Sequence, residues 1–237
     1  MSKFFFQGFL ICTFLFSCSS IPKKSMNITG SIDGLRKGTL YLQKLKDSLL
    51  INVDSFKIKG NSNYSLADDV SSSEMYYLYL EKEDGDTLND RISFFGEKGK
   101  ITINTLLSTY ESSAKISGSE NQILWEEYNA MLKKFNDKNL SLIKDFINNK
   151  DVVEKNKRLI DFENESNKLL KRRYLFSLNF ASMHSDKEIA PYISLYEIPD
   201  ANPILLDSVY SKLTMNIKNS KYGKLFGEYL DEIKQNE

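Results

Sequence analysis

Cysteine and histidine, the side chains that most often serve as nucleophiles, bases and metal ligands, are scarce in this sequence. The 237 residues include two cysteines, Cys12 and Cys18, and one histidine, His184. A His/Cys metal site needs several such ligands, and no G-x-S-x-G motif supports a serine triad around the one histidine. We therefore expect His184 to be a solvent-facing residue near a helix end, and we expect no catalytic residue, metal or cofactor.

Cys18 follows a segment with the three-part layout of an export signal. Lys3 provides a positive start, residues 4–16 are almost wholly apolar, and a small serine precedes the cysteine. The order Leu15-Phe16-Ser17-Cys18 resembles the bacterial lipobox, in which the cysteine thiol takes a diacylglycerol and a peptidase frees its amino group. The apolar run is shorter than the ~20 residues of a membrane-spanning helix. We predict a signal peptide over residues 1–17 and lipidation at Cys18, detectable as palmitate; the alternative is an ordinary signal peptide with an incidental cysteine.

Composition after the signal excludes several kinds of function. With Cys12 removed and Cys18 acylated, no thiol remains for disulfide exchange or nucleophilic cysteine chemistry. The whole chain has 32 Lys and Arg against 32 Asp and Glu, so it lacks the overall basic excess that is typical of nucleic-acid binding domains. We therefore expect no nucleic-acid partner.

Glycine and proline divide the rest of the chain into two unlike halves. Eight of the eleven glycines lie between Gly30 and Gly118, and that interval contains no proline. Short runs with apolar alternation fill it, which predicts an antiparallel β-sandwich-like domain or open barrel over residues 27–118. The expected strands include 26–32, 39–45, 49–53, 56–58, 64–66, 75–80, 92–94, 101–103 and 115–116. The run from Met75 to Leu80 is apolar on both faces, so we place this strand centrally in its sheet. We expect its tyrosines 76, 77 and 79 to be core residues; the alternative is that they line a ligand groove.

From Ser119 onward the apolar spacing becomes helical. Ser119 and Gln122 fit a capping box, and two apolar stripes predict a long antiparallel helical hairpin, with an interruption near Asn136-Asp137. Shorter helices are expected at 186–196, after Asn202-Pro203 and from Ser220. The expected fold class is α+β, with a tether over 18–26, a β-domain over 27–118 and a separable α-helical domain over 119–237.

The amino-terminal half resembles a known family. Residues 27–35 (Asn-Ile-Thr-Gly-Ser-Ile-Asp-Gly-Leu) and 38–42 (Gly-Thr-Leu-Tyr-Leu) are similar to the opening of domain of unknown function 4369. Ile101-Thr102-Ile103, residues 116–119 and Tyr222-Gly223-Lys224 continue the likeness. The resemblance implies a Bacteroidota lipoprotein. Many such proteins continue into a thioredoxin-like domain with a Trp-Cys-x-x-Cys centre, which we expect to be absent here because its redox residues have no counterparts.

Two charged clusters are open to more than one interpretation. The acidic run 81–86 suggests calcium, but its glycine is misplaced for an EF-hand loop, so a solvated turn at Asp84-Gly85 is favoured. Lys168, Lys171, Arg172 and Arg173 could meet lipid head groups or an acidic partner, although a solvated helix face is favoured.

These patterns together predict a membrane-anchored cell-envelope lipoprotein that acts as a non-catalytic binding or interaction module. Its partners would be membrane lipid, through acylated Cys18, and an envelope protein. Ser19 and Ser20 follow the cysteine without an acidic run, which favours the outer membrane, facing the periplasm. The alternative is an accessory component of a thiol–disulfide system whose redox domain is on another chain or lost by truncation. A hydrolase that uses scattered carboxylates ranks last.

Overall fold

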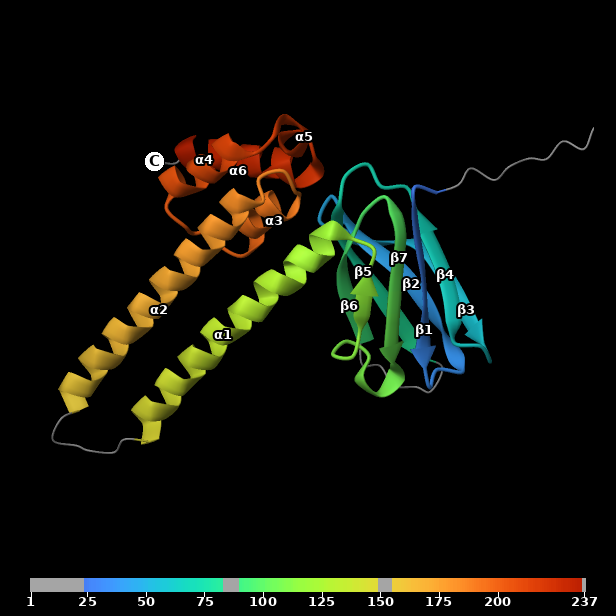
Figure 1. Ribbon diagram of the computed structural model, residues 1–237, viewed down its shortest axis with the longest axis horizontal. Coiled ribbons are helices and arrows are strands. Elements are labelled where there is room, and N and C mark those ends of the chain that lie inside the picture. Colours follow the sequence, from blue (N-terminus) through green and yellow to red (C-terminus); the bar gives the residue numbers. More distant parts are fainter. Residues whose placement is uncertain (1–23, 83–89, 149–154, 236–237) are drawn as a thin grey trace, which may run out of the picture.

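Two four-stranded sheets face each other in the amino-terminal part of the chain (Figure 1). The computed structural model describes residues 24–82, 90–148 and 155–235. The order in one sheet is β4-β1-β7-β8 and in the other β3-β2-β5-β6. The strands are β1 (Met26–Asp33), β2 (Lys37–Lys46), β3 (Leu49–Lys59), β4 (Asn63–Asp68), β5 (Glu74–Lys82), β6 (Asp90–Gly96), β7 (Gly99–Leu106) and β8 (Lys115–Ser117). The expected sandwich-like α+β class is confirmed.

Strand pairing follows the hydrophobic pattern, with two differences from the prediction. β1 pairs with β7 in parallel, whereas the other pairs are antiparallel. The sequence pattern missed this because an apolar alternation gives a strand's faces and not its direction. The expected strands 49–53 and 56–58 form one strand, β3, which continues through a register shift opposite Leu42 and Gln43.

β5 lies inside its sheet, between β2 and β6, as its two apolar faces predict. Tyr76, Leu78 and Leu80 face the core between the two sheets. Met75 and Tyr77, on the opposite face, contact the core formed by the helices. Successive side chains of a strand point to opposite faces, so β5 contributes to both cores.

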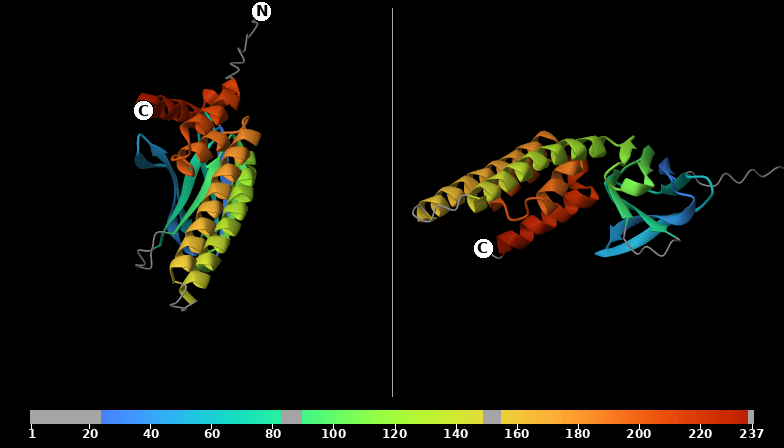
Figure 2. Two further views of the ribbon diagram at one scale, coloured as in Figure 1. Left: turned by 90° about the vertical axis from the view of Figure 1, so that its left-hand side faces the viewer. Right: turned by 90° about the horizontal axis from the view of Figure 1, so that it is seen from below.

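The remaining chain is helical, and its two long helices form an antiparallel hairpin whose distal end stands clear of the other elements (Figures 1 and 2). The expected interruption near Asn136-Asp137 is wrong, because the first helix is continuous. α5, which no pattern predicted, is a single turn capped by Thr214. Within the described ranges, no helix is long and apolar enough to cross a membrane. The helices are α1 (Glu120–Asn148), α2 (Lys155–Met183), α3 (Ile189–Tyr196), α4 (Pro203–Lys212), α5 (Met215–Lys218) and α6 (Lys221–Gln235).

The change from strands to helices falls at Gly118 and Ser119, between β8 and α1. Gly118 has φ +98°, and a Cβ at this position would lie 2.1 Å from the carbonyl oxygen of Lys100, so only glycine fits. The Ser119 hydroxyl accepts a hydrogen bond from the Gln122 amide at 3.1 Å, which confirms the cap. The return bond of a capping box is not formed, because the Gln122 side chain is buried against β6 and accepts from the Phe95 amide at 3.0 Å.

The helical core extends onto the outer face of the β3-β2-β5-β6 sheet. Met75 of β5 and Phe95 of β6 are buried in the same cluster as side chains from the helices. The Phe95 ring packs edge-on against Trp125 and Tyr192, with centroid separations of 6.2 and 5.1 Å. The two halves of the chain are therefore joined by a buried, aromatic contact as well as by the peptide link.

Candidate binding cleft

A cleft of 710 Å³ opens where the outer face of the β3-β2-β5-β6 sheet meets the helices. We call it the tyrosine cleft. Clefts of several hundred cubic ångströms that combine aromatic walls with a few polar groups are typical ligand sites. Its lining residues come from the β2–β3 turn, β5, α3 and α6: Leu45, Asp47, Ser48, Met75, Tyr77, Tyr192, Tyr196, Lys221, Tyr222, Lys224, Leu225 and Glu228.

Three tyrosines on α3 and α6 form one wall of the cleft. The Tyr192 ring lies 4.9 Å from Tyr196 and 5.1 Å from Tyr222, centroid to centroid. The Tyr222 hydroxyl accepts a hydrogen bond from the Met75 amide at 2.9 Å, which ties α6 to β5. The wall is therefore held by both ring packing and a backbone contact.

Burial keeps these tyrosine hydroxyls in their neutral form. It raises the pKa of Tyr192, of Tyr196 and of Tyr222 above the usual value of 10.0. A neutral phenol both donates and accepts hydrogen bonds. The wall consequently offers flat apolar surface and neutral hydrogen-bonding groups, rather than phenolate nucleophiles.

A series of ion pairs between charged side chains supports the cleft on its sheet side. The Lys221 ammonium group of α6 pairs with the buried Glu74 carboxylate and donates to the Leu45 carbonyl at 2.8 Å. Glu74 also lies 3.5 Å from the Lys44 ammonium group, which pairs with Asp68 at 2.7 Å. These contacts join α6 to β5, β2 and β4, and so fix the two sides of the cleft relative to each other.

Asp68, which accepts from Lys44 in this series of contacts, has a lowered pKa. Burial raises the pKa of Asp68, but hydrogen bonds from the Lys44 ammonium group and the Tyr76 hydroxyl together lower it by more. The net result is a pKa below the usual 3.8. The Tyr76 hydroxyl donates to Asp68 at 2.8 Å. At neutral pH the carboxylate is therefore ionised and holds both donors.

The aromatic surface continues from the cleft along the sheet. The Arg91 guanidinium lies 6.0 Å from the Tyr77 ring centroid and 5.3 Å from that of Tyr79, a cation–π arrangement. Tyr79 in turn stacks on Tyr41, with centroids 6.0 Å apart. Tyr77, which lines the cleft, is thus the start of a partly exposed row of aromatic side chains.

The structure separates the three tyrosines that the sequence grouped. Tyr76 is fully buried in the sandwich core, so the core interpretation is correct for it. Tyr77 lines the cleft, and Tyr79 lies partly exposed on the same outer face. The groove interpretation therefore fits Tyr77, while Tyr79 shares its face of the sheet but does not line the cleft, because alternate strand residues face the same side of a sheet.

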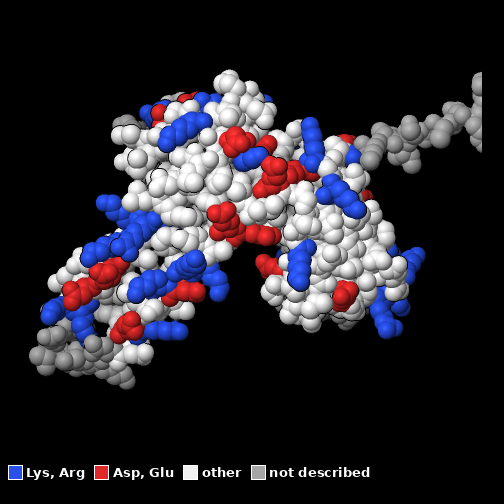
Figure 3. Space-filling model, in the orientation of Figure 1, with Lys and Arg blue, Asp and Glu red and all other residues white. Residues whose placement is uncertain are grey.

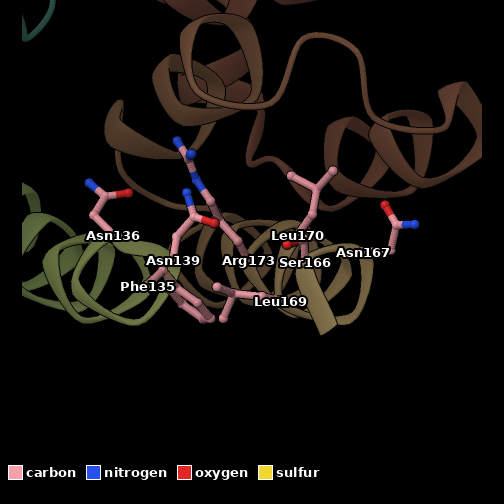
Figure 4. A pocket seen from close by; sticks show the side chains of 8 residues that line it. All are labelled: Phe135, Asn136, Asn139, Ser166, Asn167, Leu169, Leu170 and Arg173. Carbon is pink, nitrogen blue, oxygen red and sulfur yellow. The ribbon is translucent and has the colours of Figure 1, made fainter. Parts of the chain in front are cut away.

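A second hollow of 230 Å³ lies on the hairpin of α1 and α2 (Figure 4). Figure 4 shows Asn139 of α1 and Arg173 of α2 extending on the same side of the two helices. The Arg173 guanidinium is 3.6 Å from Glu197, and Phe135 at the edge of the hollow is only partly buried. Its lining residues are Phe135, Asn136, Asn139, Ser166, Asn167, Leu169, Leu170 and Arg173.

The basic residues noted on the second helix lie on this hairpin, where Lys and Arg alternate with Asp and Glu over the surface (Figure 3). Lys168 pairs with Glu165 at 2.8 Å, and Lys171 and Arg172 are exposed. This arrangement fits the solvated helix face that the sequence favoured, because these side chains are exposed and Lys168 forms its ion pair within the same helix.

The remaining predicted residues are not among those that line the cleft. Cys12 and Cys18 fall outside the described residues, as does the expected turn at Asp84-Gly85. His184 follows the end of α2, as expected, but it is partly buried, with its ring 4.5 Å from Phe180. Within the described residues no group of three or more His, Cys, Asp and Glu side chains could hold a metal ion.

Sequence reasoning missed most of the cleft. Tyr192, Tyr196 and Tyr222 occur in helical patterns that predict core positions equally well. Lys221 and its partner Glu74 are 147 positions apart, and nothing local in the sequence connects them. Only the tertiary structure brings these side chains together.

Comparison with known proteins gives one match. Residues 26–125 match the family model described as Domain of unknown function (DUF4369). The match runs from β1 into the first turns of α1, so the resemblance at the opening of the β-domain is confirmed, whereas Tyr222-Gly223-Lys224 lies beyond it. No curated protein and no solved structure matched the chain.

Proposed function

Because residues 26–125 form a domain of the DUF4369 family, whose description assigns no activity, we propose a function from the site itself. The protein is a lipid-anchored cell-envelope lipoprotein that acts as a non-catalytic binding module, and the tyrosine cleft is its ligand site. The observation that carries this proposal is the cleft between the sheet and α6, with its tyrosine wall and supporting ion pairs.

The chemistry of the cleft favours binding over catalysis. Its tyrosines are neutral, and the Lys221 ammonium group is already paired with Glu74. Rigid tyrosine surfaces give large contact area at a low cost in side-chain entropy, which is why they are common in binding sites. The charges at the rim are mixed, with Lys224 and Glu228 on α6 and Asp47 on the β2–β3 turn. The expected ligand therefore has little net charge and presents apolar or flat surface with hydrogen-bonding groups.

Site-specific photo-crosslinking in cell envelopes tests the cleft. A photoreactive phenylalanine analogue replaces Tyr196, whose side chain lines the cleft and is 52% exposed. The matched control carries the analogue at Tyr41, which is partly exposed at the far end of the aromatic row. A discrete cross-linked product at position 196, absent at position 41 and reduced by excess unmodified protein, is the expected result. Equal labelling at both positions, or none at 196, would remove the cleft as the ligand site.

Metabolic labelling tests the anchor. Radiolabelled palmitate should enter the wild-type protein and not Cys18→Ala, because only Cys18 follows the apolar segment and Ser17. Acyl chains contribute ~0.8 kcal/mol for each buried methylene, so two or more chains hold a protein at a membrane. Equal labelling of both proteins would show that acylation does not depend on Cys18.

A further inference from the structure

The turn between β2 and β3 carries three exposed leucines, with Leu45 and Leu50 on one face of the hairpin and Leu49 on the other. We define the β2–β3 tip as residues 45–50. Leu45, Leu49 and Leu50 in this tip are 41%, 69% and 40% exposed. Exposed leucines that gather in one place commonly mark a surface that contacts another molecule or a membrane.

The tip holds these leucines in a fixed position. Leu45 is the cross-strand partner of Leu50, and Lys46 is the partner of Leu49. Only Asp47 and Ser48 separate the strands, with φ +48° and +65°, the left-handed conformations of a tight two-residue hairpin turn. Residues other than glycine adopt such conformations at some cost. The tip is therefore a short, constrained projection rather than a long loop.

The tip lies at the end of the sandwich where β1 begins (Figures 1 and 2). The Asp69 carboxylate accepts hydrogen bonds from the Lys24 ammonium group at 2.8 Å and from the Ser25 amide at 3.1 Å. The adjacent Asp68 pairs with Lys44 at 2.7 Å, and Lys44 directly precedes the tip. A short series of contacts thus links the first described residues to the tip.

The tether limits how far this end can stand from the membrane. Lys24 follows Cys18 by six residues, and six residues span at most about 20 Å when fully extended. An acylated Cys18 would therefore hold this end of the sandwich, and not the distal end of the α1–α2 hairpin, close to the bilayer. Lys46 is exposed there, which suits a surface of anionic head groups.

We propose that the β2–β3 tip lies in the head-group region of the bilayer that holds the Cys18 anchor. This proposal rests on the lipid anchor of the proposed function. Leu45, Asp47 and Ser48 belong both to the tip and to the lining of the tyrosine cleft. The contact consequently orients the molecule with the mouth of the cleft beside the membrane, and the cleft takes ligands presented at the membrane surface.

Fluorescence from a single introduced thiol tests the contact. Leu49→Cys is labelled with an environment-sensitive dye in the acylated protein, which has no other free thiol, and the protein is reconstituted into vesicles containing anionic phosphatidylglycerol. The matched control is Ile147→Cys near the distal end of α1, where the side chain is 64% exposed. We expect a blue shift, at least a twofold rise in emission and quenching by spin-labelled lipid at position 49, with no change at position 147.

Two further outcomes separate this proposal from its premise. If palmitate does not enter the protein, the anchor has failed. The tip is then tested with Cys18 replaced by a histidine tag on vesicles of nickel-chelating lipid, again with the dye at position 49. Unchanged emission at this position, in protein that floats with the vesicles by either anchor, would overturn the proposal. A blue shift that depends on protein concentration in detergent without vesicles would also overturn it, because a second copy would then cover the leucines.

Discussion

Phe94 and Phe95 are adjacent on β6 and face two different hydrophobic cores, so alanine at each position tests whether those cores fold together. Both side chains are fully buried. Phe94 packs in the sandwich, stacked on Tyr76 at 6.0 Å. Phe95 packs among the helices, against Trp125 and Tyr192. The two variants remove the same atoms from the same strand and differ only in the core that they damage.

The expected loss of stability is large and similar for both variants. Truncating a buried phenylalanine to alanine costs about 3–5 kcal/mol, through lost transfer free energy and the cavity that remains. Phe95 has two edge-on ring contacts and Phe94 has one stacked contact, so Phe95→Ala should lie at the upper end of this range. The hydrogen bond from the residue 95 amide to Gln122 uses the backbone and survives in the variant.

Urea unfolding followed by two probes distinguishes one folding unit from two. Trp125 is the only tryptophan and contacts Phe95, so its fluorescence reports the interface, while far-UV circular dichroism reports the whole fold. Because Met75 and Phe95 are part of the helical core, we expect one transition with coincident midpoints in both variants. With an m-value of about 2 kcal/mol/M, a loss of about 4 kcal/mol lowers the midpoint by about 2 M.

The refuting result is a split between the probes. If Phe94→Ala left the fluorescence midpoint at its wild-type value while part of the dichroism signal was lost at lower urea, the sandwich would unfold without the helices. The division at Gly118 and Ser119 would then separate two independent domains, as the sequence pattern predicts, and the shared aromatic contact would contribute little to cooperativity.

Three further predictions concern single contacts. Ser119→Ala should lower the free energy of unfolding by about 1 kcal/mol, measured by thermal unfolding, because it removes the cap on the Gln122 amide. Asp68→Asn should destabilise the protein at pH 7, because it removes a paired carboxylate. The pKa of Asp68 is held below 3.8 in the folded state. The stability that the ionised carboxylate contributes is therefore present above pH 3.8 and is lost as the pH falls through the folded-state pKa. The stability difference from wild type should therefore shrink in acid, and a difference that is constant between pH 7 and pH 3 would contradict this. Tyr128→Phe should cost about 1–3 kcal/mol in urea unfolding, because the buried Ser177 hydroxyl loses a partner at 2.8 Å.

Local sequence patterns were enough to predict most of the strands and the long helices. Period-two alternation identified the strands and helical spacing identified the long helices, and Asn202-Pro203 begins α4 with the Asn202 side chain accepting from the Ile204 amide. These patterns arise from which face of each element avoids water, and residues close in the chain are enough to show them. The two apolar faces of β5 also predicted its central place in the sheet.

How those faces meet depends on the tertiary structure. The parallel pairing of β1 with β7 depends on the path of the whole chain, and an alternating pattern is the same for either strand direction. The tyrosine cleft is lined by both Tyr77 and Tyr222, which lie far apart in the sequence, and its support depends on Lys221 reaching Glu74, 147 positions away. Such contacts form because packing the helices on the sheet buries apolar surface, and that free energy is a property of the assembled fold rather than of any segment.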